Sequence, residues 1–162
     1  MENRTGREVL KLVICLVTCQ LAGAIGSFFT APAISSWYIA LSKPSFTPPN
    51  WLFAPAWIAL YTLMAVSAFL VWRVGLHDAR VRKALSIFGL QLLFNALWSP
   101  AFFGLRSPLA GAIVIVVLWI TILWTLVRFR TISLPAALLL VPYILWVSFA
   151  TALNISIATM NM

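Results

Sequence analysis

The chain has 162 residues, of which 63% are hydrophobic and only 9% are charged, and its mean hydropathy is +1.03. A soluble domain is about half apolar and about a quarter charged, so a chain of this size cannot bury that much apolar surface in one water-soluble core. The composition therefore excludes a soluble enzyme and a disordered chain, and indicates an integral membrane protein in contact with the lipid bilayer. The formal net charge of +8 is carried by residues between the apolar runs, which favours membrane orientation over nucleic-acid binding.

Five apolar segments are each close to the roughly 20 residues that cross a bilayer as a helix. They cover residues 9–29, 51–72, 84–103, 108–127 and 134–157. None alternates with period two for long, and backbone groups in lipid must pair within their own segment, so helices are expected rather than a β-barrel. The sequence thus predicts an all-α membrane protein, a bundle of five transmembrane helices forming one domain over residues 1–162.

The first apolar segment follows a basic N-terminus, which allows two interpretations. Small residues at 22–24 resemble a signal-peptidase site, but the apolar run continues to Phe29 and is long enough to span. We therefore expect an uncleaved first helix rather than a removed signal peptide. Cys15 and Cys19 stand four residues apart on one face of this helix without nearby His or acids, so they are interpreted as packing residues rather than metal ligands.

Several residues predict where the helices begin, end or bend. Thr47 and Ser107 are each followed by proline, a pattern typical of an N-cap that opens a helix. Pro100 is expected to bend or end the third helix. Pro142 lies inside the fifth segment and is expected to kink it, because it cannot donate to the carbonyl of Leu138.

The distribution of basic residues predicts the orientation in the membrane. The N-terminus and the second and fourth loops together carry nine Lys and Arg, whereas the first loop, the third loop and the tail carry two. The positive-inside rule then places the N-terminus in the cytoplasm and the C-terminus outside. The first loop, residues 30–50, is consequently extracytoplasmic.

Most catalytic chemistries lack their residues in this chain. The single His and the single Asp are adjacent, at His77 and Asp78, in a loop. No carboxylate lies inside an apolar segment, and the three acids of the chain cannot form a buried metal cage. Hydrolysis, phosphoryl transfer, ion pumping and a metal site are therefore not expected.

Three stripes at helical spacing combine aromatic rings with hydrogen-bonding groups inside the apolar segments. They are Phe53, Trp57, Tyr61 and Met64 in the second segment, Gln91, Asn95, Trp98 and Phe102 in the third, and Tyr143, Trp146, Ala150 and Asn154 in the fifth. Unpaired amides and phenols are costly in hydrocarbon, so these stripes must face the bundle interior. They serve either as interhelical hydrogen bonds or as the lining of a cavity for a large, flat, apolar guest, and the three together favour the cavity.

The first loop is a candidate lid over such a cavity. Trp37, Tyr38 and Phe46 are costly to expose to water, and several prolines stiffen the loop. Lys43 is its only base. Its ammonium could meet an anionic group of the guest, or it could contact a lipid headgroup.

Three motifs resemble those of the TspO/translocator protein family, also called the peripheral benzodiazepine receptor or tryptophan-rich sensory protein family. They are Trp37-Tyr38-x2-Leu41-x-Lys43-Pro44-x3-Pro48-Pro49-x-Trp51, Gln91-x3-Asn95-x2-Trp98-Ser99 and Pro142-Tyr143-x2-Trp146-x2-Phe149-Ala150. The resemblance covers essentially the whole chain. The tail after Asn154 lacks the Tyr and the base of the animal cholesterol-recognition pattern. The resemblance is therefore to a bacterial-type member, which implies a bacterial cytoplasmic membrane.

The resemblance implies a five-helix bundle, commonly a homodimer, with a pocket closed by the first loop. Family members bind protoporphyrin IX and related tetrapyrroles, benzodiazepine-type and isoquinoline carboxamide drugs and, in animals, cholesterol. No cofactor is implied beyond the tetrapyrrole ligand. With the stripes and the lid, the expected ligand-binding set is Tyr38, Lys43, Pro48, Phe53, Trp57, Tyr61, Gln91, Asn95, Trp98, Tyr143, Trp146, Phe149 and Ala150.

Three functions are consistent with this resemblance. The leading hypothesis is a membrane receptor or sensor for tetrapyrroles. The second is an enzyme that degrades porphyrin with light and oxygen, in which the resemblance points to Trp57 and Trp146 as catalytic residues. The third is a transporter of tetrapyrrole or sterol. For the homodimer, Gly23-x3-Ser27 and Ala22-x3-Gly26 in the first helix are pairs of small residues that allow close helix approach. The family resemblance suggests the third helix as the dimer face, where this chain has only Gly89 and Ala96 among bulky residues.

Overall fold

The computed structural model describes residues 2–162, and the regular structure in this range is entirely helical. The elements are α1 (Glu2–Ile34), α2 (Trp37–Ala40), the 3₁₀ helix η1 (Asn50–Leu52), α3 (Phe53–Trp72), α4 (Ala79–Ser99), the π-helix η2 (Pro100–Gly104), α5 (Pro108–Arg130), α6 (Leu134–Leu139) and α7 (Val141–Met160). Five segments in this range are long and apolar enough to cross a membrane. The predicted all-α bundle of five transmembrane helices is confirmed.

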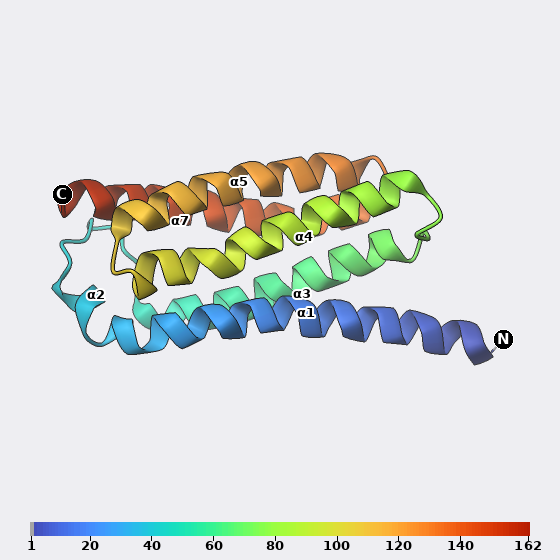
Figure 1. Ribbon diagram of the computed structural model, residues 1–162, viewed down its shortest axis with the longest axis horizontal. Coiled ribbons are helices and arrows are strands. Elements are labelled where there is room, and N and C mark those ends of the chain that lie inside the picture. The colour runs from blue at the N-terminus through green and yellow to red at the C-terminus, as the bar shows by residue number, and fades with distance from the viewer. Residues whose placement is uncertain (1) are drawn as a thin grey trace.

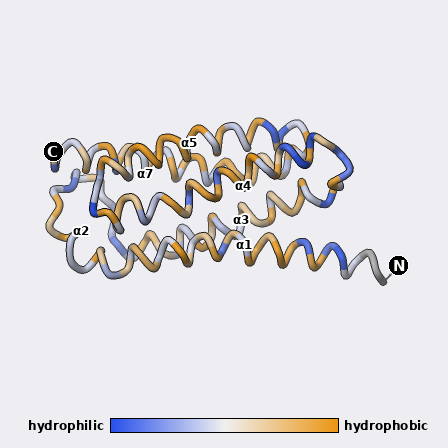
Figure 2. Tube along the Cα trace, viewed as in Figure 1, coloured by the Kyte–Doolittle hydropathy of each residue, from blue (hydrophilic) through white to orange (hydrophobic). Residues whose placement is uncertain are grey.

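The five long segments run alternately up and down in an elongated bundle (Figure 1). In this view α1 and α3 lie along one edge and α5 along the other, with α4 and α7 between them. The odd number of crossings puts the N-terminus and the C-terminus at opposite ends of the bundle. Residues along the helices are mostly hydrophobic, and hydrophilic residues gather at the two ends (Figure 2).

The outward faces of the helices are apolar, as contact with lipid requires. Large hydrophobic side chains are exposed on every crossing, including Phe28 with 78% of its surface exposed and Leu145 with 64%. The interior contains Cys15 and Cys19, both buried in the main apolar cluster. Their expected role as packing residues agrees with this position.

Helices α1, α4 and α5 extend beyond the apolar segments predicted at 9–29, 84–103 and 108–127. Helix α4 begins at Ala79 because Asp78 caps it, its Oδ1 accepting the N–H of Arg80 at 2.8 Å. Helix α5 continues to Arg130, where basic side chains in the last turn interact favourably with the helix dipole. Apolar composition marks the hydrocarbon depth, whereas a helix can continue into the headgroup region.

The lid is shorter than the predicted loop at 30–50, because α1 continues to Ile34. The lid loop is therefore residues 35–49, and it contains the single turn α2. The predicted N-cap role of Thr47 is wrong. Its hydroxyl donates to the carbonyl of Pro44 at 2.7 Å within a turn, and α3 is entered through η1 instead.

The remaining predicted helix signals agree with the structure. Ser107 Oγ accepts the N–H of Ala110 at 3.2 Å and caps α5. Helix α4 ends directly before Pro100, and the chain continues as the π-helix η2. The fifth crossing is divided into α6 and α7 at Leu140, two residues before Pro142, which has no N–H to continue the helix ladder. The chain therefore departs from a regular α-helix at two sites within its crossings, at η2 and at Leu140.

Candidate functional site

A cavity of about 480 Å³ lies among α1, α3, α4, η2 and α7, with α2 at one end. Its wall is mainly apolar and aromatic, with a few polar groups, as is typical of sites for small organic molecules. Of the residues predicted from sequence, the structure brings seven to this wall: Tyr38, Phe53, Trp57, Tyr61, Asn95, Trp98 and Ala150. They come from the lid, α3, α4 and α7, so separate crossings converge on one space.

Flat rings line the cavity in stacked pairs. The Trp57 and Tyr61 rings, one turn apart on α3, stack with centroids 5.5 Å apart and an interplanar angle of 30°. The Trp98 and Phe102 rings stack at 5.7 Å and 28°. Each pair presents a broad aromatic surface of the kind on which a planar ligand stacks.

Tyr38 closes the lid end of the cavity. Its ring packs against Phe102 and Phe103, with centroids 6.2 Å and 5.7 Å away. Burial raises the pKa of Tyr38, because the phenolate would be poorly solvated there, so the hydroxyl remains neutral. Tyr38 lines the cavity, and among the described residues its hydroxyl makes no hydrogen bond.

A chain of hydrogen bonds runs behind the wall and joins three crossings. Tyr61 donates to Asn95 Oδ1, Asn95 Nδ2 donates to the Tyr143 hydroxyl at 2.8 Å, and Tyr143 donates to Gln91 Oε1 at 2.9 Å. Gln91 and Tyr143 are buried and do not line the cavity. Within residues 2–162, Gln91 Nε2 ends the chain without a partner. These amides and phenols thus act as interhelical hydrogen bonds, while Tyr61 and Asn95 also face the cavity.

A second polar contact fixes the indole of Trp98. Its Nε1 donates to Asn154 Oδ1 at 3.0 Å, and Asn154 Nδ2 donates to the carbonyl of Pro108 at 2.8 Å. Gly111 makes room for this arrangement, since a Cβ there would lie 2.9 Å from Asn154 Oδ1. The contact therefore ties α4 and α7 to the start of α5 beside the cavity.

Helix α1 supplies a wall of the cavity that was not among the predicted ligand-binding residues. Gly23, Gly26, Gln20 and Thr30 all line the cavity. A Cβ at Gly23 would lie 2.8 Å from Cδ2 of Tyr61 and closer still to Cε2, so only glycine admits this ring. A Cβ at Gly26 would lie 3.4 Å from Ser99 of α4, so both glycines let α1 approach its neighbours within the bundle. The polar Gln20 and Thr30 within an apolar segment were the available signal.

Besides Gln91 and Tyr143, three further predicted site residues lie outside the cavity, in a second depression. Pro48, Trp146 and Phe149 line a separate shallow groove of about 430 Å³ between α7 and the segment of Pro48 and η1. Phe53 stands at the boundary, because it lines the cavity while its ring contacts that of Trp146 at 6.1 Å. The indole Nε1 of Trp146 is buried and has no hydrogen-bond partner among the described residues.

Lys43 does not line the cavity either. Its ammonium donates to the carbonyls of Tyr38, Ile39 and Leu41 at 2.8, 3.2 and 3.0 Å, and it lies 4.8 Å from the centroid of the Tyr38 ring. Lys43 therefore caps α2 and holds the turn of the lid that carries Tyr38.

Comparison with known proteins identifies relatives over nearly the full chain. The sequence pattern of the TspO/MBR family matches residues 15–160. Over 155 residues the chain is 43% identical to the tryptophan-rich protein TspO of Chlorobaculum tepidum, covering 96% of this chain and 98% of that protein. It is 45% identical to the protein of the same name from Archaeoglobus fulgidus, covering 95% and 99%. It is 34% identical to the human translocator protein over 131 residues, covering 80% and 78%. These matches, together with the five apolar crossings, show that the chain belongs to the TspO/MBR family of multi-pass membrane proteins.

Proposed function

We propose that the protein is a membrane receptor or sensor that binds tetrapyrroles such as protoporphyrin IX in the cavity beneath Tyr38. The observation that carries this proposal is the convergence of Trp57, Tyr61 and Trp98 on one cavity of about 480 Å³. That volume lies within the roughly 300–1,000 Å³ of known small-molecule pockets. Stacked indole and phenol faces suit a planar, mainly apolar macrocycle better than a flexible chain.

The polar groups of the site suit the edge of such a ligand. A tetrapyrrole carries carboxylate side chains on one edge, and these need a hydrogen-bond donor when water is excluded. The neutral Tyr38 hydroxyl supplies a donor without a partner among the described residues, and the Lys43 ammonium lies beside the same ring. The ligand would therefore place its acidic edge at the lid and its apolar edge toward Tyr61.

A titration of protoporphyrin IX into the detergent-solubilised protein tests the proposal through quenching of tryptophan fluorescence. Trp57→Ala removes a stacking face and is expected to weaken binding about tenfold. Trp124→Ala is the matched control, because Trp124 lies away from the cavity with 42% of its surface exposed. Equal affinity of the wild type and Trp57→Ala would contradict this site.

Light-dependent degradation is a second candidate, since a porphyrin in this cavity would contact the Trp57 indole directly. It predicts loss of the porphyrin Soret band in light and oxygen but not in darkness, with slower loss in Trp57→Phe. Trp146→Phe tests the second candidate residue, which lies in the outer groove. If free porphyrin bleaches as fast as bound porphyrin, this candidate is wrong.

We also propose for this chain the other properties that the family resemblance implies. They comprise homodimer formation, binding of isoquinoline carboxamide or benzodiazepine-type drugs, and transport of tetrapyrrole or sterol. Flux of porphyrin into liposomes with and without the protein separates transport from binding alone. Size determination in detergent, with the bound detergent subtracted, tests the homodimer.

A further inference from the structure

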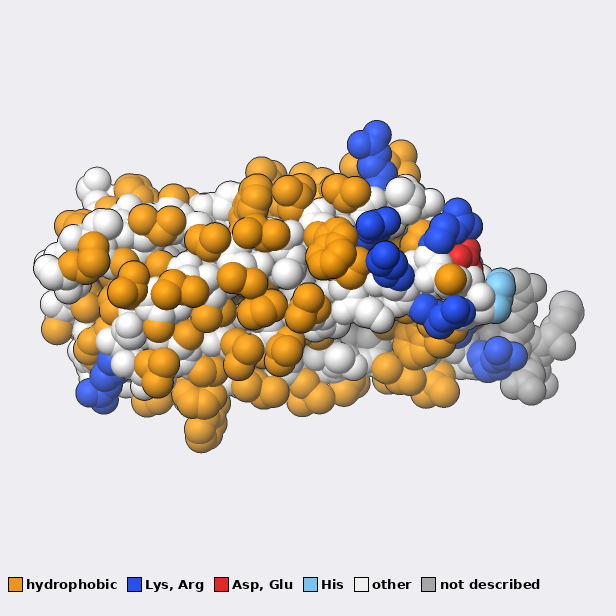
Figure 3. All heavy atoms as spheres, turned by 45° about the horizontal axis from the view of Figure 1, so that its top comes forward, with side chains coloured by type: hydrophobic (Ala, Val, Ile, Leu, Met, Phe, Trp, Pro, Cys, Tyr) orange, Lys and Arg blue, Asp and Glu red, His pale blue; other side chains and the backbone are white. Residues whose placement is uncertain are grey.

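Positive charge is concentrated at one end of the bundle, beside apolar surface (Figure 3). The described bases at this end are Arg7, Lys11, Arg73, Arg80, Arg82, Lys83, Arg128 and Arg130. The acids described there with side chains are Glu8 and Asp78. Local carboxylates therefore cannot neutralise all of these cations.

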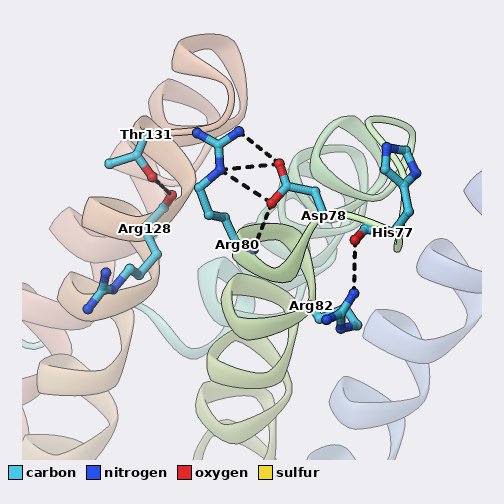
Figure 4. A network of polar contacts seen from close by, with 6 residues as sticks. All are labelled: His77, Asp78, Arg80, Arg82, Arg128 and Thr131. Atoms are coloured by element: carbon cyan, nitrogen blue, oxygen red, sulfur yellow. Dashed lines mark hydrogen bonds and ion pairs between the residues drawn. The ribbon is translucent and has the colours of Figure 1, made fainter.

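Some of these cations are already engaged in the fold. Arg80 pairs with Asp78, its Nη2 lying 2.8 Å from Oδ2 (Figure 4). Hydrogen bonds from Arg80 also lower the pKa of Asp78, which keeps this pair ionised. Lys11 lies 2.7 Å from Glu8. Arg82 donates to the carbonyls of Leu76 and His77 and so supports the loop between α3 and α4.

Lys83, Arg128 and Arg130 form a different group. Within residues 2–162, none of their side chains has a carboxylate within ion-pair distance or a hydrogen-bond partner. All three are exposed. They lie at the start of α4 and the end of α5, which are packed side by side (Figure 1). We call the corner formed by Lys83, Arg128 and Arg130 the basic corner.

Lipid-facing apolar stripes lead directly to this corner. On α5, exposed Ile120, Trp124 and Val127 occupy the turns below Arg128, and Trp124 stands one turn below it on the same face. On α4, exposed Leu90 and Leu93 lie on the face that leads to Lys83. Tryptophan below a base is typical of the interface between acyl chains and phosphates. The free cations thus lie at headgroup depth rather than far out in water.

We propose that the basic corner binds the headgroup of an anionic phospholipid, with its phosphodiester at Lys83 and Arg128 and its acyl chains along the α4 and α5 stripes. A zwitterionic lipid fits less well, because its own cation compensates the phosphate charge. A nucleic acid or an acidic protein would match the charge but not the adjoining apolar stripes. The same combination of basic residues between helix ends and lipid-facing surface recognises anionic headgroups in other membrane proteins.

The experiment measures thermal unfolding of the purified, delipidated full chain in detergent, with added phosphatidylglycerol or phosphatidylcholine. We expect phosphatidylglycerol to raise the melting temperature more than phosphatidylcholine does. Lys83→Gln with Arg128→Gln should remove at least about half of this difference, since it removes both proposed phosphate contacts. The matched control Arg7→Gln with Arg106→Gln removes the same charge elsewhere, and it should keep the difference.

The outcomes separate a lipid site from a general effect of charge. Equal stabilisation by the two lipids, or equal loss in both double variants, would overturn the proposal. Stabilisation by glycerol phosphate or by a single-stranded oligonucleotide equal to that by phosphatidylglycerol would overturn it too. If the Gln variant folds poorly, the charge-conserving pair Lys83→Arg with Arg128→Lys decides: it should retain the preference for phosphatidylglycerol, and its loss contradicts the proposal.

Discussion

At the scale of single residues, the interior depends on amides and phenols that satisfy one another across helices. Tyr143 is fully buried and joins Asn95 on α4 to Gln91 one turn earlier. In a medium without water, each of these groups would be costly if it lost its partner. The hydrogen-bond chain therefore holds α3, α4 and α7 in one relative arrangement, and this arrangement fixes the Tyr61 and Asn95 surfaces of the cavity.

Tyr143→Phe should lower the free energy of unfolding by about 1–3 kcal/mol, because it leaves Asn95 Nδ2 and Gln91 Oε1 without partners. Tyr38→Phe is the control, since its hydroxyl has no partner among the described residues. That variant should keep wild-type stability within about 0.5 kcal/mol and bind porphyrin more weakly. Reversible unfolding in detergent measures stability. Equal stability of the two variants would show that the chain of hydrogen bonds contributes nothing.

Gly23→Ala should reduce both stability and porphyrin affinity. The added Cβ would overlap the Tyr61 ring, which is also held by Asn95 and cannot withdraw freely. Overpacking of this kind costs about 1–3 kcal/mol. Gly89→Ala is the matched control on α4, where a Cβ meets nothing within 4 Å, and it should leave both quantities unchanged. A melting temperature for Gly23→Ala equal to that of Gly89→Ala contradicts the close contact.

At the scale of elements, the lid loop 35–49 is attached to the bundle by different contacts at two places. Its first part packs Trp37 and Tyr38 against the rings of η2. Its middle is bound by Asn161, whose Oδ1 accepts the N–H of Ser42 at 3.0 Å and whose Nδ2 donates to the carbonyl of Ser42 at 2.9 Å. The Asn161 amide thus bonds both backbone groups of a residue 119 positions away, as a neighbouring backbone would.

Asn161→Ala should loosen the lid without disturbing the cavity wall. If two hydrogen bonds worth about 0.5–1.5 kcal/mol each are lost and the lid must open for release, porphyrin should dissociate about 5- to 150-fold faster. Thr159→Ala is the control, because its hydroxyl donates only to the local carbonyl of Ser156. Stopped-flow recovery of tryptophan fluorescence measures the rate. Hydrogen exchange at Ser42 reports the loosening even without ligand, and unchanged exchange would rule out this role for Asn161.

At the scale of the whole molecule, the asymmetry of charge predicts its orientation. The end that carries the N-terminus and the loops after α3 and α5 holds most of the bases, whereas Lys43 and Arg106 lie at the other end. The positive-inside rule places the basic end in the cytoplasm. The lid, and with it the Tyr38 end of the cavity, would then face the outside of the cell.

Two introduced cysteines test this orientation. Ser45→Cys in the lid should react with a membrane-impermeant maleimide in intact cells, and Thr131→Cys, between α5 and α6, only after permeabilisation. Both positions are exposed, and the natural Cys15 and Cys19 are buried at 8% and 1% exposure, so the wild type should give little background. The reverse labelling pattern would show that the C-terminus is inside.

Local sequence determined the crossings. Every segment that spans the membrane must itself be apolar, and its backbone N–H and C=O groups must form hydrogen bonds within the segment. The same reasoning identified Ser107, Pro100 and Pro142 as places where the helix begins or its ladder is interrupted. The aromatic and amide stripes indicated which faces turn inward, since exposure of an amide to lipid is costly. Tyr38, Trp57, Asn95 and Ala150, which the family resemblance also indicated, lie on the cavity wall.

Only the tertiary structure decided how inward-facing residues are shared between the cavity and the packing behind it. Tyr61 and Tyr143 look alike in sequence, yet one lines the cavity and the other lies behind it, because helix rotation and the break at Leu140 set their directions. The sequence also did not predict that Gly23 lines the cavity or that Asn161 forms hydrogen bonds with Ser42. Composition and periodicity describe one helix at a time, whereas a cavity and a lid are formed by contacts between segments far apart in the chain.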